Sequence, residues 1–151
     1  CGVRSRGAAP HHPFDDMGPL SDLPRLLPQA DVVCSVLPST PQTAGIADQA
    51  FFDAMRDGAY FANAGRGDLV NQRALVEALA SGHLSGAALD VCTPEPLPAE
   101  SPLWDAPNLL LTPHVSGQFH LAVTLDNIVG IAAENLAHLA AGEALRNHVN
   151  A

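Results

Sequence analysis

The sequence predicts an α/β fold built on a parallel β-sheet, and two observations lead to that prediction. Short apolar runs rich in small and β-branched residues alternate with helical stretches along the chain. Such alternation is typical of βαβ units, in which a helix connects one parallel strand to the next. The first of these runs is also continuously apolar, as expected for a strand that is covered on both faces.

Four apolar runs are predicted to be the buried strands, and they cover residues 32–37, 59–62, 86–91 and 109–111. The run 32–37 is bounded by Asp31 and Pro38, which are typical strand boundaries. Helices are predicted at residues 21–29, 45–55, 71–81 and 118–141. The helix 71–81 begins at a capping asparagine and ends before Gly82, and its leucines recur at helical spacing. Segments rich in proline, and in the first case also glycine, are predicted to be loops at residues 7–20 and 93–107.

Length and charge limit the classes of function. The 151 residues are enough for one domain with a sizeable core, and a hydrophobic content of 47% argues against disorder. No apolar run is long enough to span a bilayer. A formal net charge of −9 disfavours partners such as nucleic acid or anionic membranes, because both require a basic face. The sequence contains no lysine, which excludes a catalytic or P-loop lysine within it.

Cysteine and histidine spacing gives no sign of a metal site or a disulfide framework. Cys1, Cys34 and Cys92 share no ligand spacing, and an odd count does not suggest a set of disulfides. The histidine pair His11-His12 is too short and too isolated for a metal site, so no metal is predicted. With no signal peptide in the sequence, the expected location is the cytoplasm.

Three segments that follow predicted strands each bring one charged or titratable group into a loop. These groups are Arg66, Glu95 and His114. Because the ligand crevice of an open α/β sheet lies outside the carboxyl ends of its strands, the three groups should converge. Arginine can hold a carboxylate through two parallel hydrogen bonds, and histidine can transfer a proton near physiological pH. A glutamate beside the histidine fixes its tautomer, so the set predicts an oxidoreductase site.

Each group taken alone has an ordinary structural explanation. Arg66 could be a surface or helix-capping arginine, Glu95 a solvated loop acid, and His114 a structural histidine. Their joint occurrence at three successive strand ends favours a site. No serine or cysteine lies in a nucleophile-elbow motif, so covalent catalysis is not predicted.

The chain also carries a set of motifs between residues 30 and 115. They lie at residues 30–33, 37–43, 57–60, 63–67, 89–91, 95–97, 101–104 and 112–115. In them the chain resembles the D-isomer-specific 2-hydroxyacid dehydrogenases, most closely the glyoxylate/hydroxypyruvate reductase A branch. The resemblance implies an incomplete, doubly wound parallel sheet of the Rossmann type. Residues 1–117 would be the C-terminal part of a dinucleotide-binding domain, and residues 118–151 a helix and tail that brace a substrate domain.

The same resemblance implies a role for each site residue. Arg66 would bind the substrate carboxylate and polarise the keto group, with His114 as general acid/base and Glu95 as its partner. His114 would protonate the carbonyl oxygen while hydride passes from the nicotinamide to the carbonyl carbon. Asp90 would accept a hydrogen bond from the nicotinamide carboxamide. The other implied cofactor contacts are Leu37, Pro38 and Thr43 on the adenosine-pyrophosphate side, Ser116 and Gly117 on the nicotinamide side, and Ala64, with Arg66 and His114 also bordering the cofactor.

The sequence departs from the family pattern in two respects. It lacks the glycine-rich turn and most of the substrate domain, so we expect it to be a C-terminal fragment that is inactive by itself. Where NAD-preferring members carry an acidic residue, this chain has Arg4-Ser5-Arg6. Arginine accommodates a 2′-phosphate, which predicts NADP as the cofactor, with NAD possible. Solvated loop arginines are the ordinary alternative.

The predicted function is an NADPH- or NADH-dependent reductase that converts a small 2-keto acid, such as glyoxylate or hydroxypyruvate, to the 2-hydroxy acid. The full-length protein is expected to be a homodimer. One alternative is another member of the family, such as a phosphoglycerate dehydrogenase type. Formate dehydrogenases replace the glutamate, so Glu95 argues against them. A second alternative is a non-catalytic dinucleotide-binding module like the corepressors of this fold, which the lack of a basic or peptide-binding signature disfavours.

Overall fold

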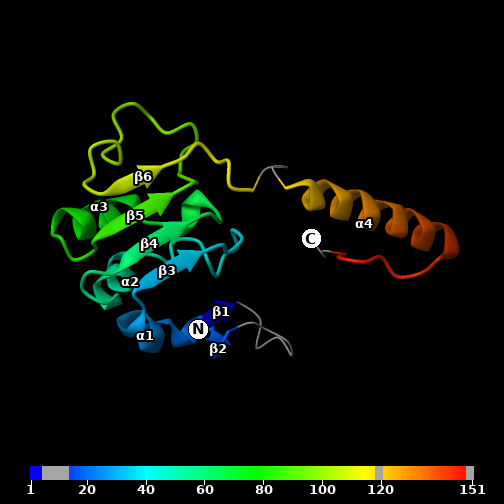
Figure 1. The fold of residues 1–151 in the computed structure, drawn as a ribbon, viewed down its shortest axis with the longest axis horizontal. Helices are drawn as coiled ribbons and strands as arrows, with labels where there is room; N and C mark the ends of the chain where they lie inside the picture. The colour runs from blue at the N-terminus through cyan, green and yellow to red at the C-terminus, as the bar shows by residue number, and fades with distance from the viewer. Residues whose placement is uncertain (5–13, 118–120, 149–151) are drawn as a thin grey trace. The chain divides into compact units, whose positions relative to one another are not determined.

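A computed structural model describes residues 1–4, 14–117 and 121–148 of the chain. It divides the chain into two compact units, Cys1–Ser116 and Gly117–Ala151. In its described residues the first unit contains two parallel sheets with their helices, and the second contains one long helix (Figure 1).

The larger sheet consists of four parallel strands in the order β3-β4-β5-β6. The strands are β3 (Val32–Ser35), β4 (Tyr60–Asn63), β5 (Gly86–Leu89) and β6 (Leu109–Leu111). This arrangement confirms the predicted α/β fold with a parallel sheet. The first and third strands end earlier than predicted, at Ser35 and Leu89, which both pair with Asn63. Because the chain turns away after Asn63, residues beyond these two positions have no strand to pair with.

Helices connect the strands at the places that the sequence predicts, with different boundaries. They are α1 (Leu23–Leu26) between the short 3-10 helices η1 (Leu20–Asp22) and η2 (Leu27–Gln29), α2 (Gln49–Ala54), η3 (Gly67–Leu69) and α3 (Gln72–Ala80). α2 begins later than predicted because Asp48 caps it, its carboxylate accepting a hydrogen bond from the Phe51 N–H at 2.9 Å. α3 is capped by Asn71, and Gly82 follows it with a φ of +77°.

The core packs α2 and α3 against one face of the larger sheet. Phe52 of α2, Phe61 of β4 and Leu75 of α3 are at most 1% exposed, and burial of such side chains stabilises by about 1.5–3 kcal/mol each. On the opposite face, Val32 and Leu110 are each 62% exposed. The expectation that the run 32–37 is covered on both faces is therefore wrong for the described structure. A run of apolar side chains does not report which of them a helix will cover.

A second, two-stranded parallel sheet is formed by β1 (Gly2–Arg4) and β2 (Met17–Pro19). β2 lies in a segment predicted to be a loop, because three residues ending in proline carry no strand pattern. In the described structure β1 and β3 each pair with one neighbour only. An apolar cavity of about 590 Å³ is lined by residues of β1, of β3 and of α1.

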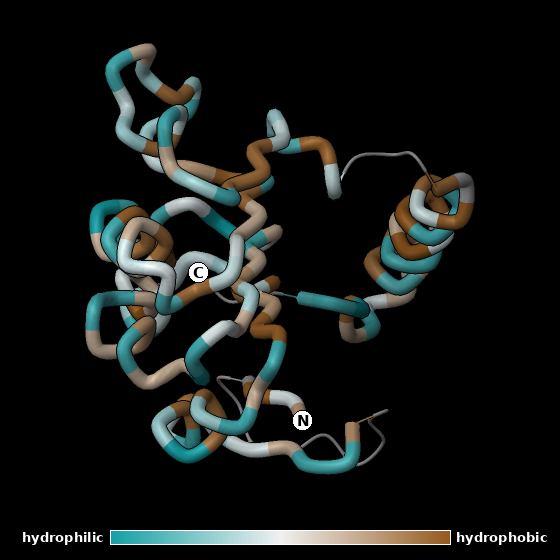
Figure 2. The backbone as a smooth tube through the Cα atoms, turned by 60° about the vertical axis from the view of Figure 1, so that its left-hand side comes forward, coloured by the Kyte–Doolittle hydropathy of each residue, from teal (hydrophilic) through white to brown (hydrophobic). Residues whose placement is uncertain are grey.

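The second unit contains α4 (Ala122–Ala141), which ends at Gly142 in the left-handed conformation with a φ of +71°. Residues 118–120 of the predicted helix 118–141 lie outside the described residues. Apolar bands recur along α4 in Figure 2, and large side chains such as Leu136 and Leu139 are more than 60% exposed. No helix in the described part of the chain is both long enough and apolar enough to span a membrane.

Candidate active site

The turn after β4 is shaped by a buried asparagine side chain. Asn63 is 1% exposed; its Oδ1 accepts from the Gly65 N–H at 3.0 Å, and its Nδ2 donates to the Arg66 carbonyl at 2.9 Å. A Cβ on Gly65 would lie 2.5 Å from the Leu37 carbonyl oxygen, so only glycine fits against the segment that follows β3. This turn fixes the backbone of Arg66, whose guanidinium donates to the Gly65 carbonyl at 2.7 Å.

The turn after β5 is organised around Asp90, which is 7% exposed. Its Oδ1 accepts from the Thr112 hydroxyl at 2.6 Å and the Val115 N–H at 2.9 Å. Its Oδ2 accepts from the Ser116 N–H at 2.9 Å and the Ser116 hydroxyl at 2.6 Å. Burial alone would raise the pKa of Asp90, but these hydrogen bonds hold it far below its ordinary value. Because a carboxylate offers about four acceptor positions, the loop after β6 fills those of Asp90.

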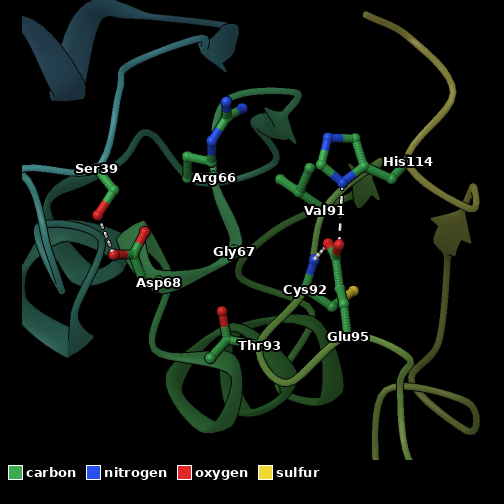
Figure 3. A pocket seen from close by; sticks show the side chains of 9 residues that line it. All are labelled: Ser39, Arg66, Gly67, Asp68, Val91, Cys92, Thr93, Glu95 and His114. Atoms are coloured by element: carbon green, nitrogen blue, oxygen red, sulfur yellow. Dashed lines mark hydrogen bonds and ion pairs between the residues drawn. The ribbon is translucent and has the colours of Figure 1, made fainter. Parts of the chain in front are cut away.

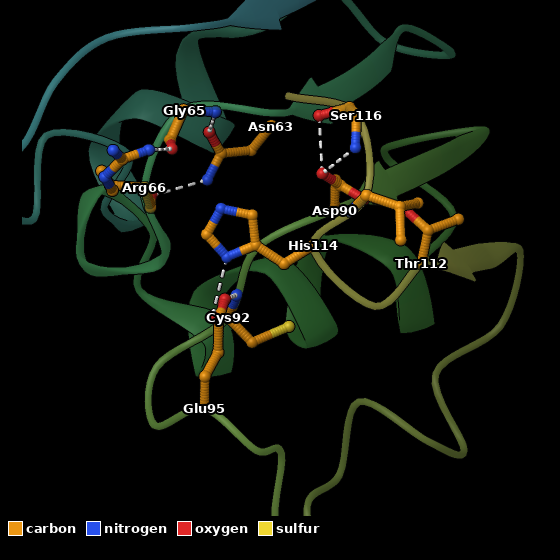
Figure 4. A network of polar contacts seen from close by, with 10 residues as sticks. Asn63, Gly65, Arg66, Asp90, Cys92, Glu95, Thr112, His114 and Ser116 are labelled. Atoms are coloured by element: carbon orange, nitrogen blue, oxygen red, sulfur yellow. Dashed lines mark hydrogen bonds and ion pairs between the residues drawn. The ribbon is translucent and has the colours of Figure 1, made fainter. Parts of the chain in front are cut away.

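The loop held by Asp90 carries His114, which has a φ of +54°. Its Nδ1 lies 2.9 Å from Oε2 of Glu95, and Oε1 of Glu95 accepts from the Cys92 N–H at 2.8 Å (Figure 4). The hydrogen bond to His114, and then that from Cys92, lower the pKa of Glu95 below its ordinary value. The predicted histidine–glutamate pair is thus formed, with side chains 48% and 39% exposed.

A cavity of about 300 Å³ brings the three predicted groups together. It is lined by Ser39, Arg66, Gly67, Asp68, Val91, Cys92, Thr93, Glu95 and His114. Figure 3 shows Arg66 between two pairs of side chains, with Ser39 and Asp68 on one side and Glu95 and His114 on the other. Gly67 packs so closely that a Cβ there would lie 1.9 Å from the Cys92 carbonyl oxygen.

The residues for which the resemblance implies cofactor contacts occupy different environments. Pro38, Ala64, Ser116 and Gly117 are exposed at or after strand ends, and Leu37 is half-buried. Thr43 is fully buried and donates from its hydroxyl to the Pro38 carbonyl at 2.6 Å, so it shapes the loop from within. The backbone of Arg4 lies in β1, whereas Ser5 and Arg6 lie outside the described residues.

Sequence reasoning assigned no role to four residues that organise this site, namely Ser39, Asn63, Asp68 and Thr112. An asparagine directly after a buried strand and before a glycine is a recognisable turn signal, so Asn63 could have been found. The other three act through contacts with residues far away in the sequence.

In the described ranges 1–4, 14–117 and 121–148, no group of three His, Cys, Asp or Glu side chains could hold a metal ion.

Comparison with known families decides what kind of chain carries this site. Residues 3–116 match the family model described as D-isomer specific 2-hydroxyacid dehydrogenase, NAD binding domain. The chain belongs to this dehydrogenase family. The resemblance stated from the sequence motifs is therefore confirmed.

Individual relatives within the dehydrogenase family agree with this assignment. The chain is 40% identical over 129 residues to glyoxylate/hydroxypyruvate reductase B of Enterobacter sp. (strain 638), covering 85% of this chain and 39% of that protein. It is 37% identical over 150 residues to glyoxylate/hydroxypyruvate reductase A of Citrobacter koseri, covering 99% of this chain and 46% of that protein. The chain thus spans less than half the length of these two relatives.

The fold of this family member also matches a solved structure. A D-isomer specific 2-hydroxyacid dehydrogenase from Xanthobacter autotrophicus Py2, in complex with NADPH and MES, superimposes with a TM-score of 0.84 and 34% identity. The match covers 99% of this chain and 60% of that one.

Proposed function

We propose that this chain is the nucleotide-binding part of an NADPH-preferring reductase of small 2-keto acids, such as glyoxylate or hydroxypyruvate. The observation that carries the proposal is the arrangement of Arg66, Glu95 and His114 around one cavity at the carboxyl edge of the sheet. A carboxylate-binding cation and a proton-transferring imidazole on one cavity match the two ends of a 2-keto acid. The reductases among the relatives support the same class of substrate.

In this proposal the side chains divide the work on the substrate. Arg66 binds the carboxylate and draws electron density from the keto oxygen. An ionised Glu95 places a proton on Nδ1 of His114, so Nε2 is the nitrogen that exchanges a proton with the substrate. In its imidazolium form His114 also carries a proton on Nε2, and it donates this proton to the carbonyl oxygen. A bound nicotinamide cofactor supplies the hydride for the carbonyl carbon.

Exposed small residues at the sheet edge fit a nucleotide cofactor. Ala64 is exposed and leaves the backbone accessible there. Pro38 and Ser116 would border the cofactor on either side. The arginines of the segment 4–6 would hold the 2′-phosphate of NADPH, and the NADPH complex of the Xanthobacter relative supports that choice.

The experiment is a turnover assay of the full-length protein that contains this chain, with glyoxylate and hydroxypyruvate against NADPH and NADH. Replacing Arg4 and Arg6 together by alanine should lower kcat/KM for NADPH far more than for NADH. Arg73→Ala is the matched control, because Arg73 is an exposed arginine on α3 that pairs with Glu77. Equal losses with both cofactors would refute the 2′-phosphate assignment, and absence of turnover with both keto acids would refute the proposed reaction.

A homodimer and a cytoplasmic location are also part of the proposal. The lack of a disulfide framework in its sequence fits a reducing compartment such as the cytoplasm. Light scattering on the full-length protein measures the oligomeric state, and a monomeric mass would exclude the dimer.

A further inference from the structure

Asp68 is a carboxylate in the cavity wall that the proposed reaction does not use. It belongs to η3 and follows Gly67 directly, which places it beside the Arg66 segment. Its Oδ2 accepts a hydrogen bond from the Ser39 hydroxyl (Figure 3). Its Oδ1 is buried and accepts no hydrogen bond from the described residues.

Asp68 and Glu95, the two acidic residues that line the cavity, differ in whether they form a salt bridge. Glu95 is paired with His114 at 2.9 Å. Among the salt bridges within the described residues, none includes Asp68. A carboxylate without a salt bridge in a cavity wall acts on any ion that enters, because the effective dielectric constant there is well below that of water.

We propose that Asp68 is a specificity-determining residue that restricts the substrate to 2-keto acids with a single negative charge, an inference that rests on the proposed function. The substrate carboxylate binds Arg66, so the remainder of the substrate occupies the cavity that Asp68 also lines. A second carboxylate or a phosphate there meets a like charge and is rejected. A hydrogen atom or a hydroxymethyl group meets no such penalty. The accepted class is therefore glyoxylate- and hydroxypyruvate-like, and phosphorylated or dicarboxylic keto acids are excluded.

A purely structural role for Asp68 makes a different prediction. The Ser39 hydrogen bond joins the loop after β3 to η3, and Asp68 could serve only to hold that loop. Ser39→Ala removes the hydrogen bond and keeps the charge, whereas Asp68→Asn removes the charge and keeps a side chain of the same size. The two variants therefore separate the roles.

The test measures kcat/KM of the full-length protein with NADPH for glyoxylate and hydroxypyruvate against oxaloacetate and phosphohydroxypyruvate. In Asp68→Asn, the preference for singly charged acids should fall by about tenfold or more, as expected for one like-charge contact across several ångströms. Ser39→Ala should keep the wild-type preference. Asp105→Asn is the control for the same change in net charge, since Asp105 is exposed and does not line the cavity.

An unchanged preference in Asp68→Asn would overturn the inference, as would an equal change in Ser39→Ala or Asp105→Asn. If Asp68→Asn does not fold, Asp68→Ser serves as the second charge-removing variant, with the same expected direction. Failure of the proposed function is recognised separately, because the wild-type protein would then turn over none of the four keto acids.

Discussion

Replacing Gly67 by alanine should damage the candidate site without touching any of its charged groups. Gly67 lies between Arg66 and the loop that carries Glu95, and a Cβ there would lie 1.9 Å from the Cys92 carbonyl oxygen and 2.1 Å from its carbon. Both of these atoms belong to the backbone, so no flexible side chain can move aside. Either the Arg66 turn or the Cys92 loop must shift.

The size of that shift follows from the contact distance. Real Cβ atoms essentially never approach closer than 3.0 Å, which is 1.1 Å more than the 1.9 Å found for this position. A misplacement of about 1 Å between catalytic groups can lower kcat/KM about 100-fold, or about 2.7 kcal/mol of transition-state stabilisation. Overpacking of this kind should also lower the free energy of unfolding by about 1–3 kcal/mol.

The assay combines 2-keto acid turnover by the full-length protein with urea unfolding followed by circular dichroism. Arg73→Ala is the control, because Arg73 is exposed on α3 of the same unit and does not line the cavity. If Gly67→Ala keeps wild-type kcat/KM and stability, then the contact between the two loops does not position the site.

Three further predictions concern the charged groups. Arg66→Lys should raise KM for glyoxylate by about tenfold or more in steady-state kinetics, because lysine lacks the planar fork; an unchanged KM would remove Arg66 as the carboxylate clamp. Glu95 has a lowered pKa, so the stability it contributes is present above its ordinary pKa and is lost as the pH falls through the lowered value. The urea midpoint of Glu95→Gln should therefore depend less on pH than that of the wild type between about pH 6 and about pH 3.5, and equal slopes would contradict this. Asp90→Asn should lower the free energy of unfolding by about 1 kcal/mol for each part-buried backbone donor of Val115 and Ser116 that it leaves unpaired, which wild-type urea stability would disprove.

The parts of the fold that were predictable are those set by local chemistry. The helix at 71–81 was found because a capping asparagine, spaced leucines and Gly82 all act within one short stretch. Strand ends were harder to predict from the sequence. β3 ends at Ser35 and β5 ends at Leu89 because both residues pair with Asn63 on another strand. β2 was missed for the same reason, because its three residues form a strand only by pairing with β1.

The same division holds for the candidate site. Arg66, Glu95 and His114 could be proposed because each follows a strand, and parallel strands bring their carboxyl ends to one edge. The four hydrogen bonds that occupy Asp90 could not be foreseen, since its partners lie more than 20 residues further along the chain. The buried position of Thr43 was also hidden, because a threonine in a turn looks the same whether it faces inward or outward.

The hydrogen bonds of Asp90 have a consequence for how this chain tolerates change in length. Asp90 starts a stretch of chain that leaves β5, and its bonds to Ser116 fasten the far end of that stretch to the start. Within the stretch, Leu103 is 1% exposed and secures the middle, whereas Ala99 and Glu100 are exposed. Such a tied segment can accept extra residues at its exposed tip while both fastened ends stay in place. The turn at 99–100 is thus a natural insertion point, where a tag or a lengthened loop should leave the histidine and its glutamate undisturbed.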